Sequence, residues 1–91
     1  MARIIERTGD SVSEAIVILD AEDEVDGVAV EYEYLARKFG NKGRYWTLKH
    51  QSLVVKGHKH CGRVDIVLSD GRERTLYFDI TDFSGKLPLG Y

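Results

Sequence analysis

Two histidines and the only cysteine of the chain lie within four positions, in the segment KGHKHCGR at 56–63. Histidine and cysteine are zinc ligands, and a cysteine beside cations can also be a reactive thiolate. A structural zinc site needs four protein ligands, and a catalytic site usually needs three. In an extended chain His58 and His60 share one face while Cys61 points to the other. The segment by itself therefore supplies too few ligands.

The third histidine, His50, is expected to lie too far away to complete such a site. With GHK as a three-residue hairpin loop, His60 pairs with Lys56, and His50 lies six residues further along that strand. At ~3.3 Å per residue this separates the two imidazoles by about 20 Å. Four neighbouring lysine and arginine residues also disfavour a divalent ion. We therefore expect no metal and no cofactor, a solvated hairpin tip, and a buried Cys61.

Paired carboxylates are the other residues that suggest chemistry. Asp79 and Asp82 lie three positions apart in FDITDF, at the end of a predicted strand. Two carboxylates in different environments can divide general acid and general base roles. The chain contains no nucleophile elbow, P-loop or dinucleotide-binding fingerprint. A small enzyme that uses Asp79, Asp82 or a histidine is therefore an alternative to the binding function argued below.

Length and composition indicate one soluble domain. The chain has 91 residues, of which 43% are hydrophobic and 31% charged, as in globular proteins. No apolar run approaches the ~20 residues that span a bilayer, and the first ten residues lack the apolar stretch of a signal peptide. One cysteine forms no disulfide within the chain, so we expect a cytoplasmic protein. We assign residues 1–91 to a single domain, with 1–12 and 84–91 as flexible or docking tails.

The charges are distributed unevenly along the chain. Residues 1–33 carry ten acids and two bases, 34–64 carry eight bases and no acid, and 65–91 carry five acids and three bases. Such asymmetry can mark an interaction surface. A helix with acids at its start and bases at its end also accounts for part of it, because those charges complement the helix dipole. The sequence leaves both explanations open.

A helix is predicted over residues 21–39. Asp20 is the expected N-cap, and Gly40 is the expected residue after the last turn. Apolar residues then recur at spacings of three and four, which places them on one face. These residues are Val25, Val28, Tyr32, Leu35 and Phe39. Gly27 interrupts the helix at a cost of about 1 kcal/mol and indicates close packing on the sheet.

Strands are predicted on both sides of this helix. The run 14–19 is rich in β-branched residues, and alternating apolar residues mark 45–55, 64–68 and 76–80. For the apolar residues of paired strands to lie on the same face of the sheet, the loop between the strands must contain an odd number of residues. GHK and SDG are therefore expected as three-residue loops, the second with Gly71 in the left-handed conformation. The fold class is therefore α+β, with one helix on a curved antiparallel sheet, in the order β-α-β-β-β. An extra strand at RIIE, 3–6, is a further option.

One face of this sheet is expected to be open to solvent, with aromatic, basic and hydrogen-bonding side chains. The expected residues are Tyr45, Thr47, Lys49, Gln51, Leu53, Arg63, Asp65, Val67, Thr75, Tyr77 and Asp79.

The strand–helix–meander order resembles the cystatin-like arrangement, in which a sheet wraps around one helix. Gln51, Val54 and Gly57 in QSLVVKG resemble the Q-x-V-x-G loop of cystatins, although Gln51 and Gly57 lie six positions apart and the motif has four. SDGR stands where that family has the Pro-Trp of its second inhibitory loop. The resemblance covers about 60 residues and implies a fold; it does not carry protease inhibition over to this chain.

The most consistent function is a small domain that binds a protein partner or itself, without catalysis. The predicted binding residues lie on the open face and the basic hairpin. They are Lys42, Arg44, Tyr45, Lys49, Lys56, His58, Lys59, His60, Arg63 and Tyr77. Nucleic-acid binding by the basic segment 37–63 is the second hypothesis, because its cations are interleaved with aromatic residues. GNKG at 40–43 matches the GxxG loop of KH domains but follows a helix C-terminus, whose dipole repels phosphate.

Overall fold

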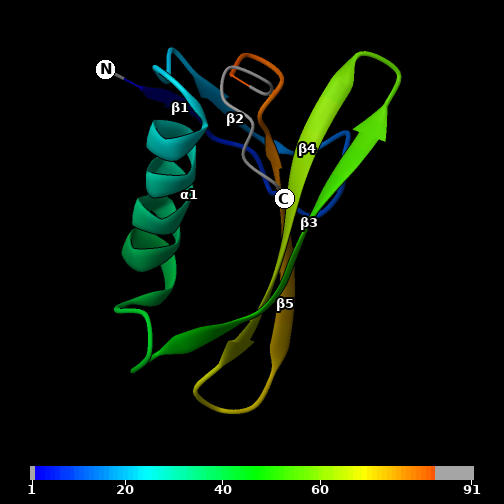
Figure 1. The fold of residues 1–91 in the computed structure, drawn as a ribbon. Coiled ribbons are helices and arrows are strands. Elements are labelled where there is room, and N and C mark those ends of the chain that lie inside the picture. The colour runs from blue at the N-terminus through cyan, green and yellow to red at the C-terminus, as the bar shows by residue number, and fades with distance from the viewer. Residues whose placement is uncertain (1, 84–91) are drawn as a thin grey trace.

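The computed structural model describes residues 2–83 and shows one compact α+β domain of two layers (Figure 1). A single helix lies against one face of a five-stranded sheet, and the β3–β4 hairpin projects away from that helix. The elements in chain order are β1 Arg3–Ile5, β2 Ile16–Leu19, α1 Glu24–Phe39, β3 Trp46–Lys56, β4 Lys59–Leu68 and β5 Glu73–Asp79. The predicted fold class and the extra N-terminal strand are confirmed.

The sheet is mixed, so the prediction of a wholly antiparallel sheet is wrong for one pair of strands. The strand order is β1-β2-β5-β4-β3, and β2 pairs with β5 in parallel. Helix α1 carries the chain from β2 to the far edge of the sheet, where β3 begins. The β3–β4–β5 meander then returns to the centre and places β5 beside β2 in the same direction. A crossover through a helix is the usual way to join parallel strands.

Helix α1 begins later than predicted. Its N-cap is Asp23, whose carboxylate accepts a hydrogen bond from the backbone N–H of Asp26 at 2.9 Å. Asp20 instead adopts a left-handed backbone, with φ of 61°, in the turn that leaves β2. Its N–H donates to the Asp82 carboxylate at 2.8 Å. In the sequence, Asp20 and Asp23 are equally good N-cap residues. The structure uses Asp23 as the N-cap, because the backbone of Asp20 is engaged by Asp82.

The buried face of α1 is rotated from the predicted one. Leu35 is fully buried as expected, but Val25 is 57% exposed. Glu31 and Tyr34 are buried instead, with Glu31 at 0% exposure. Gly27 lies against Phe83, just after β5, and not on the sheet itself. The helix therefore packs through positions 27, 31 and 35, and the predicted residue Tyr32 lies on its flank near β3, in contact with Gln51 and Trp46.

The first meander hairpin has a two-residue loop, so the predicted three-residue loop is wrong. Lys56 pairs with Lys59, and His60 pairs with Val55. With a two-residue loop, Trp46 and Leu48 reach the core face of the sheet only because a β-bulge shifts the register between Leu48 and His50. A bulge adds one residue to one strand, which returns the residues before it to the core face. The second loop, 69–71, is as predicted, with Gly71 at φ of 88°.

The bulge changes which side chains occupy the open face of β3. Gln51 faces the helix, because its side chain accepts a hydrogen bond from the Tyr32 hydroxyl at 3.0 Å. By alternation Leu53 faces the same way, and His50, Ser52 and Val54 face the open side. Gln51 and Leu53 were therefore assigned to the wrong face. Leu53 remains 43% exposed, where the hairpin projects away from α1 (Figure 1).

The core lies between α1 and the centre of the sheet. It contains Ile16, Ile18, Leu35, Trp46, Val64, Ile66, Leu76, Phe78, Ile80 and Phe83. Within residues 2–83, no helix combines the length and apolarity needed to cross a bilayer.

Candidate binding groove

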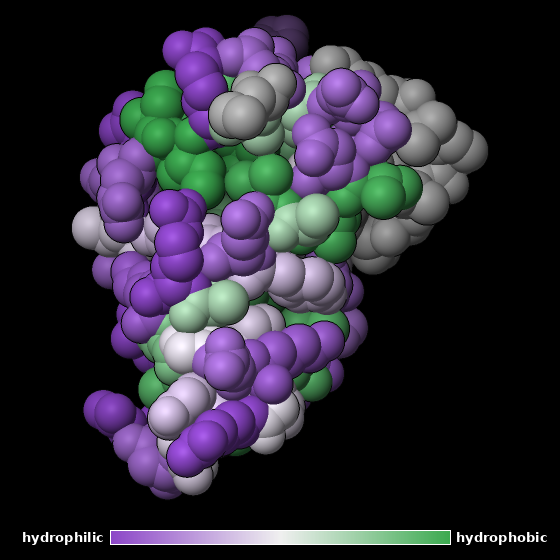
Figure 2. All heavy atoms as spheres, turned by 90° about the vertical axis from the view of Figure 1, so that its left-hand side faces the viewer, coloured by the Kyte–Doolittle hydropathy of each residue, from purple (hydrophilic) through white to green (hydrophobic). Residues whose placement is uncertain are grey.

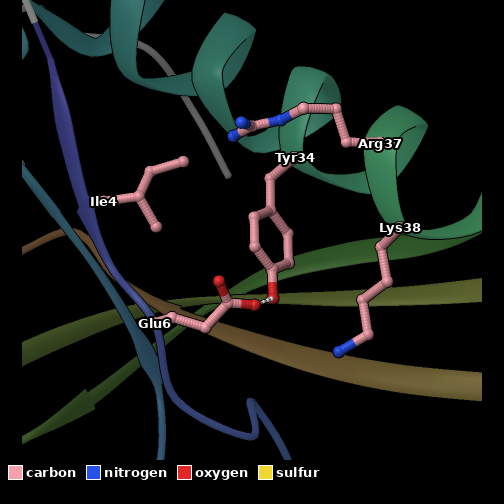
Figure 3. Close-up of a pocket in the computed structure, with 5 residues that line it drawn as sticks. All are labelled: Ile4, Glu6, Tyr34, Arg37 and Lys38. Carbon is pink, nitrogen blue, oxygen red and sulfur yellow. Dashed lines mark hydrogen bonds between the residues drawn. The ribbon is translucent and has the colours of Figure 1, made fainter.

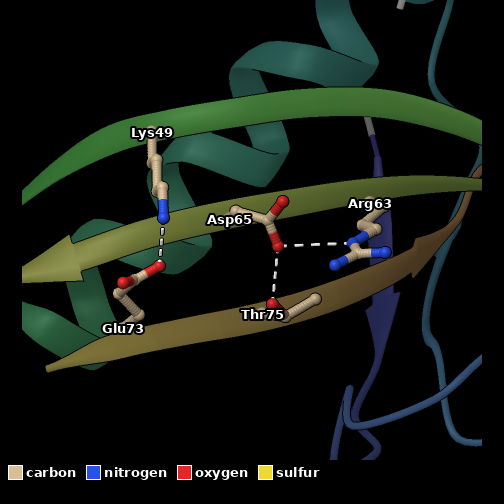
Figure 4. A network of polar contacts seen from close by, with 5 residues as sticks. All are labelled: Lys49, Arg63, Asp65, Glu73 and Thr75. Atoms are coloured by element: carbon tan, nitrogen blue, oxygen red, sulfur yellow. Dashed lines mark hydrogen bonds and ion pairs between the residues drawn. The ribbon is translucent and has the colours of Figure 1, made fainter.

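Basic side chains on the open face of the sheet form ion pairs with acidic side chains of the same sheet (Figure 4). Lys49 forms an ion pair with Glu73, and Arg63 forms one with Asp65 at 3.3 Å. Burial alone disfavours the charged carboxylate, but hydrogen bonds from Thr75 and Arg63 outweigh that cost and lower the pKa of Asp65. Two predicted binding residues, Lys49 and Arg63, are thus engaged with acids from their own sheet.

The other predicted binding residues fall into two clusters at opposite ends of β3. Lys42, Arg44 and Tyr45 lie in the loop between α1 and β3, where the Lys42 ammonium lies 5.0 Å from the Tyr32 ring centre. Residues 56–60 form the hairpin tip at the other end. The 11 residues of β3 span roughly 35 Å at ~3.3 Å each, so the clusters do not form one patch. Tyr77 lies apart from both, on β5.

The side chains proposed for chemistry do not converge. His50 pairs with Asp65 and His60 with Val55, so about five residues of strand, ~17 Å, separate the two histidines. In the described part of the chain, no group of three His, Cys, Asp or Glu side chains could hold a metal ion. Cys61 is fully buried, and this burial raises the pKa of its thiol above the usual range. A protonated, buried thiol is a poor nucleophile.

The two candidate catalytic aspartates have separate structural partners. Asp79 accepts hydrogen bonds from the backbone N–H and the hydroxyl of Thr81, at 3.1 and 2.6 Å. Asp82 accepts from the backbone of Asp20. Each carboxylate therefore closes a local turn or a chain crossing, and the two have different hydrogen-bond partners.

A groove that sequence analysis did not anticipate lies between β1 and α1. One cavity of about 400 Å³ is lined by Ile4, Glu6, Tyr34, Arg37 and Lys38 (Figure 3). A second, of about 570 Å³, is lined by Ala2, Ile4, Glu22, Asp26, Val30, Glu33 and Arg37. Because the two cavities share Ile4 and Arg37, we describe them together as the β1–α1 groove. In Figure 2, which views the side of the molecule that carries α1, hydrophobic surface is exposed among hydrophilic residues in the upper half.

One end of the groove is fixed by a hydrogen bond between its walls. The Tyr34 hydroxyl donates to Oε1 of Glu6 at 2.7 Å, as Figure 3 shows. Tyr34 is only 5% exposed, and its ring packs edge-on against Phe78 in the core. Burial, the hydrogen bond to Glu6 and the negative charge of Glu6 together raise the pKa of Tyr34 to about 12. The contact therefore ties the chain after β1 to the helix.

This contact predicts a loss of stability in alkali. The folded state keeps the Tyr34 proton up to about pH 12, and the unfolded state releases it near pH 10. The stabilisation is therefore complete below pH 10 and is lost as the pH rises from 10 to 12. Chemical denaturation across this range should show a steeper fall for the wild type than for Tyr34→Phe. Tyr45→Phe, an exposed control, should follow the wild type; equal slopes for all three proteins would contradict the assignment.

Charge in the groove is separated along its length. Glu22, Asp26 and Glu33 line the wider cavity, Lys38 lines the narrower one, and Arg37 lines both. Glu6 is the one acid at the basic end, where the Tyr34 hydroxyl binds it. Between these ends the walls are formed by Ile4 and Val30. The groove can therefore take a mainly apolar segment that carries opposite charges at its two ends.

The wall opposite the helix is the edge of the sheet. Among the described strands, β1 pairs only with β2, through Arg3 with Leu19, Ile4 with Ile18 and Ile5 with Val17. An edge strand presents backbone N–H and C=O groups on its outer side, which can pair with another chain. The other edge, β3, is interrupted by its bulge and carries Lys49 and Lys56, features that discourage pairing.

No single signal in the sequence could have identified this groove. Its residues come from 2–6 and 22–38, segments that the tertiary fold brings together. The one indication in the sequence is the predicted extra strand at RIIE, 3–6, which forms one wall of the groove.

Comparison of the chain with protein-family models, with curated proteins and with solved structures finds no match. The class of protein is therefore defined by the fold and the groove alone: a two-layer α+β domain with a groove between an edge strand and a helix.

Proposed function

We propose that this protein is a small protein-binding domain that takes an extended segment of its partner into the β1–α1 groove. One observation carries the proposal: the groove lies between an edge strand and a helix. A segment added beside β1 gains main-chain hydrogen bonds from the strand and places alternate side chains in the groove. The single cysteine, buried and without a disulfide, supports a cytoplasmic location for this function.

The chemistry of the groove defines the segment that fits. Side chains facing Ile4 and Val30 should be apolar, because these residues form the middle of the walls. A basic side chain suits the end at Asp26, and an acidic one suits the end at Arg37 and Lys38. Since β1 has only three residues, few backbone hydrogen bonds are available, and we expect moderate affinity.

This geometry favours a protein partner over nucleic acid. The largest aromatic residue of the basic segment, Trp46, is 1% exposed and donates its indole N–H to the carbonyl of Gly40 at 2.9 Å. It is therefore in the core and not on a surface where bases could stack. Among the cations of the segment, Lys42 and Arg44 lie at one end of β3, and Lys56 and Lys59 lie at the other. Arg37 and Lys38 lie on α1, and Lys49 and Arg63 are paired with acids.

The proposal is tested with two variants of the same strand. Ile4 lines the groove, and Ile5, its neighbour, is 45% exposed and points to the opposite face of the sheet. Short random peptides displayed on phage would be selected on the immobilised wild type, and the affinities of the enriched sequences measured. Ile4→Asp should weaken their binding at least tenfold, and Ile5→Asp should change it less than about twofold.

Arg37→Glu provides a second variant that does not alter the apolar wall, since this residue is exposed on α1. It should weaken acid-containing peptides in particular. Melting curves for all three variants would establish that each is folded. Equal binding by Ile4→Asp, Arg37→Glu and the wild type would overturn the proposal, as would a selection that enriches no peptide.

A further inference from the structure

Resting on the proposed function, we infer that the segment taken up beside β1 is the β1 strand of a second copy of this chain. Two copies would pair β1 with β1 in the antiparallel sense, about a two-fold axis perpendicular to the sheet. This is the isologous type of contact, in which one surface is complementary to itself. The sheets of the two copies would become continuous through the β1 edges.

The axis also determines how the helices meet. A two-fold axis perpendicular to the sheet keeps both α1 helices on the same face and makes them antiparallel. Ile4 is the middle residue of β1 and lines both cavities of the groove, together with Val30 in one and with Tyr34 in the other. A two-fold axis that passes near Ile4 therefore also passes beside α1 close to residue 32. Residue 32 is midway along the helix between Asp26 and Lys38.

The charges of the groove are complementary under this rotation. The acidic end, Glu22 and Asp26, of one copy faces the basic end, Arg37 and Lys38, of the other, and the reverse contact occurs on the other side of the axis. Two further acids line the groove: Glu6 is held at the basic end by the Tyr34 hydroxyl, and Glu33 lies one helical turn from Arg37 of its own copy. A surface with opposite charges at its two ends attracts its own copy when the copy is turned by 180°. With the same ends meeting, as in a parallel arrangement, like charges would repel.

The apolar middle of the groove is covered in the same contact. Ile4 and Val30 of both copies would lie close to the axis, and their exposed surface would be removed from water. The contact is small, with three residues in each strand and one flank of each helix. We therefore expect a dimer with a dissociation constant of roughly 10–100 µM, weaker than obligate dimers. High salt should weaken it further, because ~1 M salt shortens the Debye length to about 3 Å.

Sedimentation equilibrium tests this inference with two oppositely charged variants. The acid-reversed variant, Glu22→Lys with Asp26→Lys, places basic groups at both ends of the groove. The base-reversed variant, Arg37→Glu with Lys38→Glu, places acidic groups at both ends. Each variant alone should self-associate at least tenfold more weakly than the wild type, because like charges meet twice in the pair.

Mixing the two variants should restore association to within about threefold of the wild type, since both contacts are then between opposite charges. The mixture also controls for folding, because a variant that had lost its structure would not pair. Lys42→Glu with Arg44→Glu makes the same charge change as the base-reversed variant, but outside the groove, and should leave association unchanged.

Distinct outcomes separate this inference from the proposed function. A wild type that stays monomeric at about 500 µM in low salt would overturn the inference. The proposed function would still stand in that case, provided that selected peptides bind in an Ile4-dependent manner. Association that neither reversed variant weakens, or that mixing does not restore, would likewise overturn the β1-to-β1 dimer.

Discussion

Replacing Trp46 by alanine is expected to lower the free energy of unfolding by about 3–5 kcal/mol. The side chain is 1% exposed, and its ring lies 6.4 Å from that of Tyr32, so truncation leaves a large cavity between α1 and β3. The indole N–H also donates to the carbonyl of Gly40. A domain of 91 residues has a total stability of about 5–14 kcal/mol, so this change removes a large fraction of it.

Two further variants separate the contributions of Trp46. Trp46→Phe keeps most of the packing but loses the hydrogen bond, and we expect a cost of about 2 kcal/mol. Tyr45→Ala removes the neighbouring aromatic side chain, which is 43% exposed, and should cost less than about 1 kcal/mol. Urea unfolding followed by far-ultraviolet circular dichroism would measure the free energy of unfolding of Trp46→Ala, Trp46→Phe and Tyr45→Ala. A loss under about 1 kcal/mol for Trp46→Ala would contradict the assigned position of this side chain.

Gly27→Ala is expected to destabilise the protein by about 1–3 kcal/mol, although alanine is the better helix former. A Cβ atom at this position would lie 2.2 Å from two carbon atoms of the Phe83 ring, which is fully buried. The overlap forces the helix or the ring to move, and the cost outweighs the gain of about 1 kcal/mol in helix propensity. The close approach of α1 to Phe83 is thus the reason for a glycine in the helix interior.

A double-mutant cycle isolates the contact between Gly27 and Phe83. Phe83→Leu alone should cost stability, because it leaves a cavity, but in the Gly27→Ala background the smaller side chain makes room for the new methyl group. We expect a favourable coupling of at least about 1 kcal/mol between the two changes. Ala29→Gly at an exposed position of the same helix measures the intrinsic propensity difference. Simple additivity, or a Gly27→Ala protein more stable than the wild type, would contradict the contact.

The order of the elements was predictable because it depends on local patterns. Hydrophobic period and turn residues identified the helix, the meander and the left-handed Gly71. The rotation of α1 was not predictable, because it depends on Gly27 meeting Phe83, a contact between distant segments. That rotation buries Glu31, a residue that composition alone assigns to the surface.

The register of β3 could not be derived from the strand pattern. Both a three-residue loop and a two-residue loop with a bulge bring Trp46 and Leu48 to the core face. The polar residues at the bulge, Lys49 and His50, carry no signal that distinguishes the two solutions. Only the pairing in the structure does so, and it moves Gln51 from the open face to the helix side.

The candidate site also depends on contacts between segments that are distant in the sequence, so the predicted site and the site in the structure differ. Sequence analysis located function where cations and histidines are dense, at 37–63, but folding separates those residues and pairs some of them with acids. The groove instead combines a three-residue strand with one flank of the helix. The segment 84–91, predicted as a flexible or docking tail, lies outside the described residues.

The central claim, that the β1–α1 groove receives an added strand, is tested most directly by amide hydrogen exchange and chemical-shift mapping on the ¹⁵N-labelled protein. Spectra would be compared between dilute protein and protein with a saturating selected peptide or at high protein concentration. We predict that shift changes and slowed exchange concentrate at Arg3–Ile5 and at the groove flank of α1, from Asp26 to Lys38. Changes confined to the hairpin tip at 56–60 or to the open face of the sheet, with β1 unaffected, would contradict the account.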